Sequence, residues 1–165
     1  MKYLFTFSLF ESKESVDEIC KKYNIKNYTI NDDKSIDVNG NVDLNGKKLT
    51  KLPLKFNKLS GYFDCSYNQL TSLEGSPKSV SGDFGCNNNQ IKDFNGFPEY
   101  FENDLYIWDN PVSNVYELFD DALKITLFNE YDIIRENEII LDRLNDFLNH
   151  IGESEVNSVK EYICI

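Results

Sequence analysis

The chain contains few residues whose type and spacing could support catalysis. Its four cysteines are Cys20, Cys65, Cys86 and Cys164, none of them in a CxxC pattern, and its one histidine is His150. Cys65 and Cys86 stand at equivalent places in a repeat, so they could form a redox pair or half of a metal site. We favour the alternative that they are core residues, because a free cysteine behaves as a small hydrophobic side chain.

The other groups that could do chemistry are no more specific. His150 lies in the segment LNDFLNHIG, which we expect to be helical, and no cysteine or serine motif accompanies it. The acids of NDDKSIDVNG lack the D-x-D-x-D-G spacing of a calcium-binding loop and favour a turn. We therefore predict no enzyme activity, no cofactor and no metal site, with Cys164 as the candidate reactive thiol.

A repeat organises the middle of the chain, and such periodicity decides the fold class. From Asn39 to Ala122, four segments of 21 residues follow one another without gaps: NGNVDLNGKKLTKLPLKFNKL, SGYFDCSYNQLTSLEGSPKSV, SGDFGCNNNQIKDFNGFPEYF and ENDLYIWDNPVSNVYELFDDA. Apolar residues recur in matched columns, which are Val42, Phe63, Phe84 and Leu105; Leu44, Cys65, Cys86 and Ile107; Leu49, Leu70, Ile91 and Val112; and Leu52, Leu73, Phe94 and Val115. So many matched columns at one spacing exclude coincidence.

The spacing within each unit predicts a short strand followed by a turn. Phe63 and Cys65 are two residues apart, so an extended strand points both side chains to one face. Asn68 completes the L-x-L-x-x-N-x-L pattern of leucine-rich repeats, in which stacked asparagines can satisfy backbone groups of the turn. Lys47 replaces asparagine in the first unit, so we expect that unit to lack this hydrogen bonding.

These patterns predict the fold class and the domain organisation. Prolines in the return half of the units, in the sequences LP, GSP and GFP, resist a full α-helix, so we expect extended or single-turn 3₁₀ connections. The prediction is an α/β fold: a leucine-rich-repeat solenoid of about four 21-residue coils with short parallel strands over residues 39–114. An α/β cap over 1–38 would cover its N-terminal end, and a helical cap over 115–165 its C-terminal end.

The two caps differ in their sequence patterns. In the N-terminal cap, a helix over 15–23 precedes a hairpin formed by IKNYTIN and SIDV. In the C-terminal cap, helical spacing extends over 115–125 and 139–148, and Gly152 ends the second helix. The last stretch, ESEVNSVKEYICI, is expected to form another short helix.

The composition limits the classes of partner. The chain has 165 residues, 41% of them hydrophobic, which fits a single globular domain. Its 17 basic and 28 acidic residues give a net charge of -11, which repels phosphate backbones, so we expect no direct nucleic-acid binding and favour a protein with a basic surface. The charge could also serve solubility alone. The sequence has no apolar run of the roughly 20 residues that a membrane span needs, and its cysteines fit a reducing cytoplasm.

The candidate site is a surface, because parallel strands place equivalent outward positions side by side. We expect the outward positions to form one concave face that binds a partner. Its residues, here called the acidic-aromatic face, are Tyr62, Asp64, Ser66, Asp83, Asn87, Asp104, Tyr106 and Trp108. Aromatic residues are typical of binding hot spots, and carboxylates steer basic partners. Tyr106 and Trp108 could instead pack under the C-terminal helices, and this alternative stays open.

The repeats also carry a family resemblance. From about Tyr23 to Pro111 the chain resembles small leucine-rich-repeat proteins encoded by large tailed bacteriophages, which share the spine G-x-F-x-C-x-x-N-x-L-x-x-L-x-G-x-P present here from Gly61 to Pro77. The repeats are also similar to the short Leu-Pro repeats of secreted bacterial effectors. The resemblance implies a phage protein that acts in the cytoplasm of an infected bacterium. The fourth unit departs from the spine, with Asn103 in place of glycine.

One N-terminal feature belongs to the same resemblance. The sequence LFE ending at Glu11 is similar to the L-x-E site that prohead proteases of such phages cut. It implies that residues 1–11 are a capsid-targeting peptide and that the protein is packaged in the virion interior. Alternatively, the apolar side chains of this segment pack on the end of the repeats. Both alternatives stay open.

Three functions follow from these observations, and we favour the first. It is a non-catalytic protein-binding module, which the resemblance makes a phage factor that engages a host protein such as a defence component. The second is an acidic nucleic-acid mimic that inhibits a DNA-acting enzyme, and the third is a packaged structural component of the virion. The acids that would form the mimic are Asp120, Asp121, Glu130, Asp132, Glu136, Glu138, Asp142 and Asp146.

Overall fold

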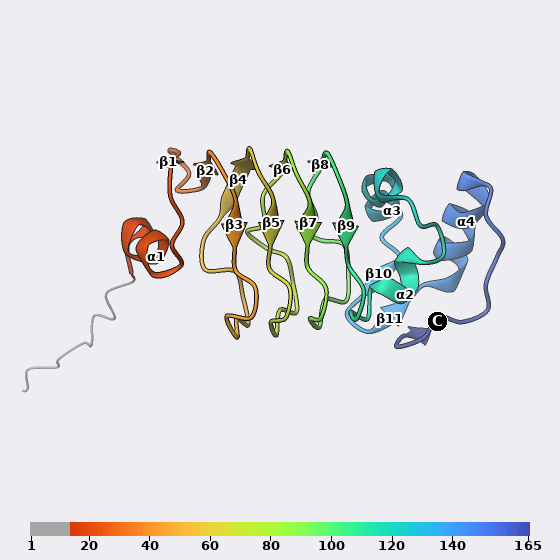
Figure 1. Cartoon of the computed structure of the whole chain (residues 1–165). Coiled ribbons are helices and arrows are strands. Elements are labelled where there is room, and N and C mark those ends of the chain that lie inside the picture. Colours follow the sequence, from red (N-terminus) through yellow and green to blue (C-terminus); the bar gives the residue numbers. More distant parts are fainter. Residues whose placement is uncertain (1–13) are drawn as a thin grey trace, which may run out of the picture.

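The computed structural model describes residues 14–165, and these residues form three separate sheets with short helices at the two ends (Figure 1). At the N-terminal end lies helix α1 (Val16–Lys22), which a side-chain capping box starts. An antiparallel hairpin of β1 (Tyr28–Ile30) and β2 (Ile36–Val38) follows. The helix and the hairpin therefore lie where the sequence predicts them.

Four parallel strands form what we call the front sheet, in the order β3-β5-β7-β9. The strands are β3 (Val42–Asp43), β5 (Phe63–Asp64), β7 (Phe84–Gly85) and β9 (Leu105–Tyr106). Paired residues on neighbouring strands lie 21 positions apart, as in the pairs Val42–Phe63 and Phe63–Phe84. The period of the sequence therefore sets the strand register.

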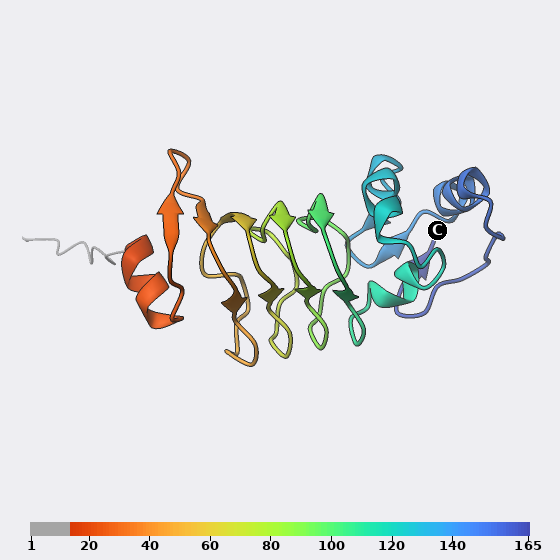
Figure 2. The same cartoon turned by 45° about the horizontal axis from the view of Figure 1, so that its top comes forward.

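A second set of strands forms what we call the back sheet, in the order β1-β2-β4-β6-β8. Besides the hairpin it contains β4 (Phe56–Leu59), β6 (Ser79–Val80) and β8 (Tyr100–Phe101). Strands β2, β4, β6 and β8 run parallel, and Lys58 pairs with Ser79 as Ser79 pairs with Tyr100, again 21 positions apart. Figure 2 shows the front and back sheets as two rows of arrows along the molecule.

Aromatic and aliphatic side chains between the front and back sheets form the core of the repeats. The rings of Phe63 and Phe84 are fully buried and stacked, with their centroids 5.6 Å apart. Phe56 of the back sheet meets Phe63 edge-on, at a centroid separation of 5.1 Å. Cys65 and Cys86 are buried in the same core as free thiols. They act there as small hydrophobic side chains, as the sequence predicts.

Asparagines of three units hold the turns that follow the front strands. The Asn89 Oδ1 atom accepts the Leu70 N–H at 2.9 Å, and its Nδ2 group donates to carbonyls of its own unit and of the preceding one. Asn68 and Asn110 repeat this pattern in the neighbouring units. Lys47, at the equivalent place in the first unit, is exposed. The predicted role of the asparagine column is confirmed, because buried backbone groups find their partners in it.

The C-terminal part contains short helices and the third sheet. Its elements are α2 (Ser113–Tyr116), the 3₁₀ helix η1 (Ala122–Lys124), α3 (Ile125–Glu130), β10 (Ile134–Arg135), β11 (Glu138–Ile139), α4 (Leu141–Ile151) and β12 (Ile163–Cys164). Strand β11 pairs antiparallel with β10 and parallel with β12. A cluster of rings joins this part to the repeats, with centroids between 5.1 and 5.9 Å apart; it comprises Phe94, Phe119, Phe128 and Phe147.

The predicted fold class is wrong beyond its general α/β character. The sequence predicted a leucine-rich-repeat solenoid with one strand in each coil, extended or 3₁₀ connections and a helical C-terminal cap. The described residues instead form a mixed α/β structure with few helices and three separate sheets, two of which share the repeats. The return segments that contain the prolines lead into strands of the back sheet, because each proline precedes the paired residues and removes no donor from the ladder.

Details of the C-terminal part also differ from the prediction. The helix expected over 115–125 is divided into α2, η1 and α3, and Asp121 caps the middle piece by accepting the Leu123 N–H. Helix α4 ends at Gly152 in a left-handed conformation, as predicted. The stretch over 153–162 contains no helix, and β12 follows it. The capsid-targeting peptide predicted over 1–11 lies outside the described residues.

Candidate functional site

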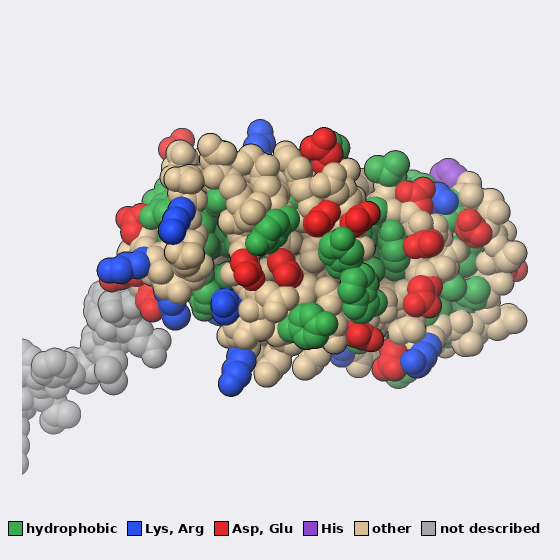
Figure 3. Space-filling model, in the orientation of Figure 1, with side chains coloured by type: hydrophobic (Ala, Val, Ile, Leu, Met, Phe, Trp, Pro, Cys, Tyr) green, Lys and Arg blue, Asp and Glu red, His purple; other side chains and the backbone are tan. Residues whose placement is uncertain are grey.

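The outward side of the front sheet carries a hollow of about 390 Å³ (Figure 3). Carboxylates and hydrophobic side chains gather over this sheet in the space-filling view. Seven of the eight residues of the acidic-aromatic face line the hollow, and Asp104 alone does not. The lining residues are Asn45, Tyr62, Phe63, Asp64, Ser66, Tyr67, Asp83, Gly85, Asn87, Tyr106 and Trp108.

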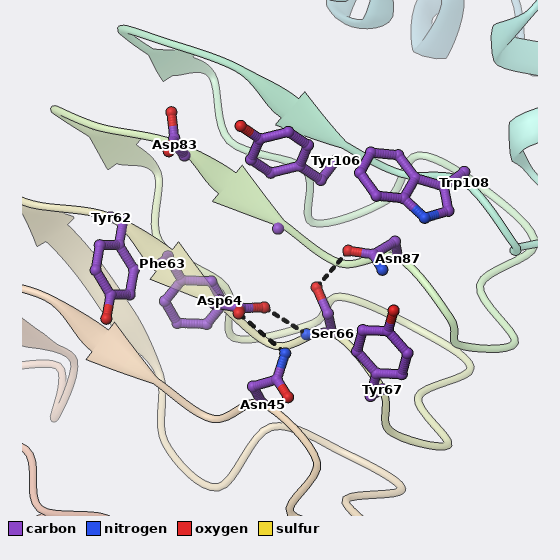
Figure 4. Close-up of a pocket in the computed structure, with 11 residues that line it drawn as sticks. Asn45, Tyr62, Phe63, Asp64, Ser66, Tyr67, Asp83, Asn87, Tyr106 and Trp108 are labelled. Atoms are coloured by element: carbon purple, nitrogen blue, oxygen red, sulfur yellow. Dashed lines mark hydrogen bonds between the residues drawn. The ribbon is translucent and has the colours of Figure 1, made fainter.

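Asp64 lies at the centre of the hollow and is held in place by hydrogen bonds (Figure 4). Its Oδ1 atom accepts the Ser66 N–H at 2.9 Å, and its Oδ2 atom accepts from Asn45 Nδ2 at 3.0 Å. The Ser66 hydroxyl in turn donates to Asn87 Oδ1 at 2.7 Å. These bonds connect three successive units, so the carboxylate is fixed in position before any ligand arrives.

Gly85 makes the hollow deep next to Asp64. The equivalent outward positions of the neighbouring strands hold Asp64 and Tyr106, whereas glycine has no side chain to occupy the space. A Cβ atom at Gly85 would lie 3.0 Å from Asp64 Oδ1 and 3.1 Å from Ser66 Oγ. The glycine therefore keeps the polar floor of the hollow open to a ligand.

Four exposed or half-buried aromatic side chains surround this floor. Tyr106 and Trp108 meet edge-to-face with their centroids 5.3 Å apart. Tyr62 and Tyr67 lie on other sides of Asp64, as Figure 4 shows. Trp108 is 49% exposed and Tyr67 59% exposed, so these rings are open to a partner. The alternative that Tyr106 and Trp108 pack under the C-terminal helices is wrong, because both rings face the hollow.

The charge of the hollow is negative. None of its lining residues is a lysine or an arginine. Asp83 Oδ1 accepts the backbone N–H of Asp104 at 3.2 Å, and the Tyr106 hydroxyl donates to Asp104 Oδ2. The charge of Asp83, followed by burial and the charge of Asp104, raises the pKa of Tyr106. The phenol therefore stays neutral and able to donate at neutral pH.

Comparisons with known proteins assign neither a family nor a function to the chain. No protein-family model, curated protein or solved structure matches this chain. The function is therefore inferred from the geometry of the hollow and from the groups around it.

Sequence reasoning missed Tyr67 as a site residue. It follows the front strand in a turn, with φ at 55°, and the equivalent turn residues are Gly46, Asn88 and Asp109, all at positive φ as well. Glycine, asparagine and aspartate tolerate this left-handed conformation, whereas an aromatic residue there is strained. Tyr67 is the one aromatic residue at positive φ within 14–165. The sequence did contain an indication of this role, because Tyr67 is aromatic where the equivalent residues of the other units are glycine, asparagine and aspartate.

The groups considered for catalysis lie apart from the hollow opening. Cys65 and Cys86 are completely buried, and burial raises the pKa of both thiols, so their thiolates are suppressed. His150 lies on α4, where its Nδ1 atom contacts the Tyr131 hydroxyl at 2.5 Å. Residues 14–165 contain no group of three histidine, cysteine or acidic side chains arranged to hold a metal ion.

The acids proposed for nucleic-acid mimicry are partly paired. Asp132 accepts from Arg135 and Arg143, both at 2.6 Å, and these two bonds lower the pKa of its carboxyl. Asp121 lies 3.8 Å from Lys124. Cations at these places interrupt the row of negative charge that a phosphate-like ridge requires. Within the described part of the chain, no helix is long and apolar enough to span a membrane.

Proposed function

We propose that the chain is a non-catalytic protein-binding module that engages a basic partner protein through the acidic-aromatic face. The observation that carries the proposal is the hollow over the front sheet, where aromatic rings surround carboxylates and no basic side chain lines the wall. Buried aromatic anchors dominate the binding energy of protein interfaces, and carboxylates accelerate the encounter with a basic surface.

The hollow also has a continuation along the molecule. A second hollow of about 450 Å³ shares Trp108 and extends past Asn114 and Glu117 towards Lys160. A partner seated on Trp108 would therefore meet two adjoining depressions. This arrangement favours a macromolecular partner over a small molecule, because a small ligand fills one enclosed pocket.

The biological setting of the proposal comes from the resemblance of the repeats to phage proteins. In that setting the chain engages a host protein, such as a defence component, in the cytoplasm of an infected bacterium. The mimic of nucleic acid receives less support, since Asp121 and Asp132 are paired with basic groups. Competition separates the two functions: duplex DNA displaces the partner of a mimic but leaves a partner anchored on aromatic rings in place.

The test reverses the charge of the hollow. A tagged copy is used to isolate partners, each candidate is purified, and its dissociation constant is measured by calorimetry for the native chain and for the double variant Asp64→Lys plus Asp83→Lys. We expect the double variant to lose at least about a hundredfold in affinity, because removed attraction and added repulsion at an interface together exceed about 3 kcal/mol.

The matched control carries the same change of charge elsewhere. Glu74→Lys plus Glu99→Lys reverses two exposed acids that do not line the hollow. This control keeps native affinity if the acidic-aromatic face binds the partner. Equal affinity of the native chain and the hollow variant, with both folded by circular dichroism, would show that the partner binds another surface.

A further inference from the structure

The hollow has the chemistry of a receptor for one particular side chain. Resting on the proposed protein-binding function, we propose that the hollow over Gly85 takes up an arginine side chain of the partner, with its guanidinium group against Asp64 and between the aromatic rings. This proposal specifies which residue type of the basic partner enters the hollow.

The carboxylates and the aromatic rings that line the hollow both favour a positively charged ligand. Asp64 and Asp83 contribute negative charge, and the lining set contains no lysine or arginine to balance them. The faces of tryptophan and tyrosine rings attract cations through their quadrupole. Rings and carboxylates on the same small surface therefore favour the same kind of ligand.

A guanidinium group fits better than an ammonium or a methylated ammonium. Each carboxylate oxygen of Asp64 already accepts one hydrogen bond, from Ser66 or from Asn45, and keeps capacity for a second. A guanidinium group offers five N–H donors in a plane, so it can bond the carboxylate and stack on a ring at the same time. A fully methylated ammonium donates no hydrogen bond and would leave this capacity unused.

The glycine in the floor gives access to Asp64. An alanine Cβ at Gly85 would stand 3.0 Å from Asp64 Oδ1 and would fill the space next to the carboxylate. Gly85 has an ordinary φ, so the backbone tolerates alanine, unlike the glycines at positive φ. Gly85→Ala therefore closes the floor without imposing backbone strain.

Tyr67 adds a further ring to the hollow from a turn position that all four units hold at positive φ. Its positive φ of 55° is unfavourable for an aromatic residue, and asparagine, which tolerates it, stands in the next unit as Asn88. Strained backbone tends to occur where a side chain serves binding. Tyr67 brings its ring to the edge of the hollow, where it can cover one face of a bound guanidinium group.

The test uses Trp108 as a reporter. It is the single tryptophan of the chain, so its fluorescence reports on ligands at the hollow and at the adjoining one that shares Trp108. The probes are short glycine–serine peptides with one central arginine, lysine, citrulline or norleucine. We expect the arginine peptide to bind about tenfold more tightly than the citrulline peptide, which keeps the shape of arginine without its charge. Lysine should fall between the two.

Variants of the chain locate the binding. Asp64→Asn plus Asp83→Asn should weaken the arginine peptide about tenfold, and Gly85→Ala should weaken it as well, while the melting temperatures confirm folding. The control Glu74→Gln plus Glu99→Gln removes the same charge outside the hollow and should leave the affinity unchanged. Equal binding of the arginine and citrulline peptides would overturn the cation assignment, and tighter binding of lysine would overturn the guanidinium assignment.

These results are separable from the test of the proposed function. If charge reversal abolishes partner binding while arginine and citrulline peptides bind alike, the acidic-aromatic face is an interface that does not select arginine. If the arginine peptide binds as expected but charge reversal leaves the partner's affinity unchanged, the guanidinium site stands and the proposed protein interface is wrong.

Discussion

The repeats and the C-terminal part of the molecule are stabilised in different ways. In the repeats, residues 21 positions apart make the same contact in successive units, as the asparagines of the turns do. In the C-terminal part, rings from a helix and from turns that share no period pack around Phe147. The repeats therefore have a regular outer surface, whereas the aromatic cluster of the C-terminal part covers the end of the repeat core.

The difference explains why the candidate site lies on the repeats. Neighbouring parallel strands repeat the same outward position at close spacing, so a few substitutions in one column create a hollow with walls on both sides. Gly85 between Asp64 and Tyr106 is such a substitution. In the C-terminal part no column exists, and its acids are distributed over the segment before η1, α3, the β10–β11 hairpin and α4.

The largest effect is expected in the aromatic cluster. Phe147 is fully buried against Phe119, Phe128 and Tyr131. Phe147→Ala should lower the free energy of unfolding by about 3–5 kcal/mol, as for other buried phenylalanines. Hydrogen exchange should show the loss of protection mainly in helix α4 and the third sheet. An equal loss in strands β5 and β7 would contradict the separation of the two regions.

A slightly smaller effect is expected in the asparagine column. Asn89→Ala leaves the buried Leu70 N–H without its acceptor and removes a donor from three carbonyls, those of Cys65, Cys86 and Asn87. The free energy of unfolding should fall by about 2–4 kcal/mol, measured by denaturant titration. Lys47→Ala, at the equivalent exposed place, is the control and should change it by less than about 0.5 kcal/mol. Equal effects at the two positions would show that the column does not stabilise the turns.

The cysteines sharpen the comparison further. Cys86 is buried in the repeats, whereas Cys164 of β12 is half-buried. Cys86→Ser places a hydroxyl in an apolar core and should lower the free energy of unfolding by about 1–3 kcal/mol, with a smaller effect for Cys164→Ser. In the native chain, Cys164 should react with a thiol reagent first, because burial raises the pKa of the Cys86 thiol. Faster labelling of Cys86 would contradict its burial.

The smallest effect concerns Tyr67 and has the opposite sign. Replacing this strained residue by the asparagine of the next unit, in Tyr67→Asn, should raise the free energy of unfolding by about 1 kcal/mol. The same variant should weaken arginine-peptide binding. The reverse change at the equivalent turn position, Asn88→Tyr, should destabilise the chain by a similar amount. A destabilising effect of Tyr67→Asn would mean that the tyrosine contributes more by packing than it loses by strain.

Much of the front sheet and the candidate site could be predicted from the sequence. Strand residues such as Phe63 and Phe84 follow from the two-residue alternation within a 21-residue period, and the outward positions follow from the same columns. The asparagine column was recognisable because its spacing from the strand is constant. Seven of the eight predicted face residues line one hollow for this reason.

The back sheet and the third sheet could not be predicted in the same way. The strands β6 and β8 are as short as the front strands, but no apolar residue stands two positions before or after Val80 or Phe101, as Cys65 stands after Phe63. Prolines close before β6 and β8 also favoured irregular connections. In the third sheet, Ile139 pairs with Cys164, and no local pattern indicates a pair so distant in the sequence. Short strands whose partners are remote are decided by tertiary contacts.

The most direct test of the binding face is site-specific photo-crosslinking. Tyr67 beside the hollow and Tyr100 on the back sheet are similarly exposed, at 59% and 53%, so a photoreactive phenylalanine derivative at either position has equal access to solvent. In cells that contain the partner, we expect a protein adduct from position 67 and none from position 100. Adducts of equal yield from both positions, or from position 100 alone, would contradict the assignment of the acidic-aromatic face as the interface.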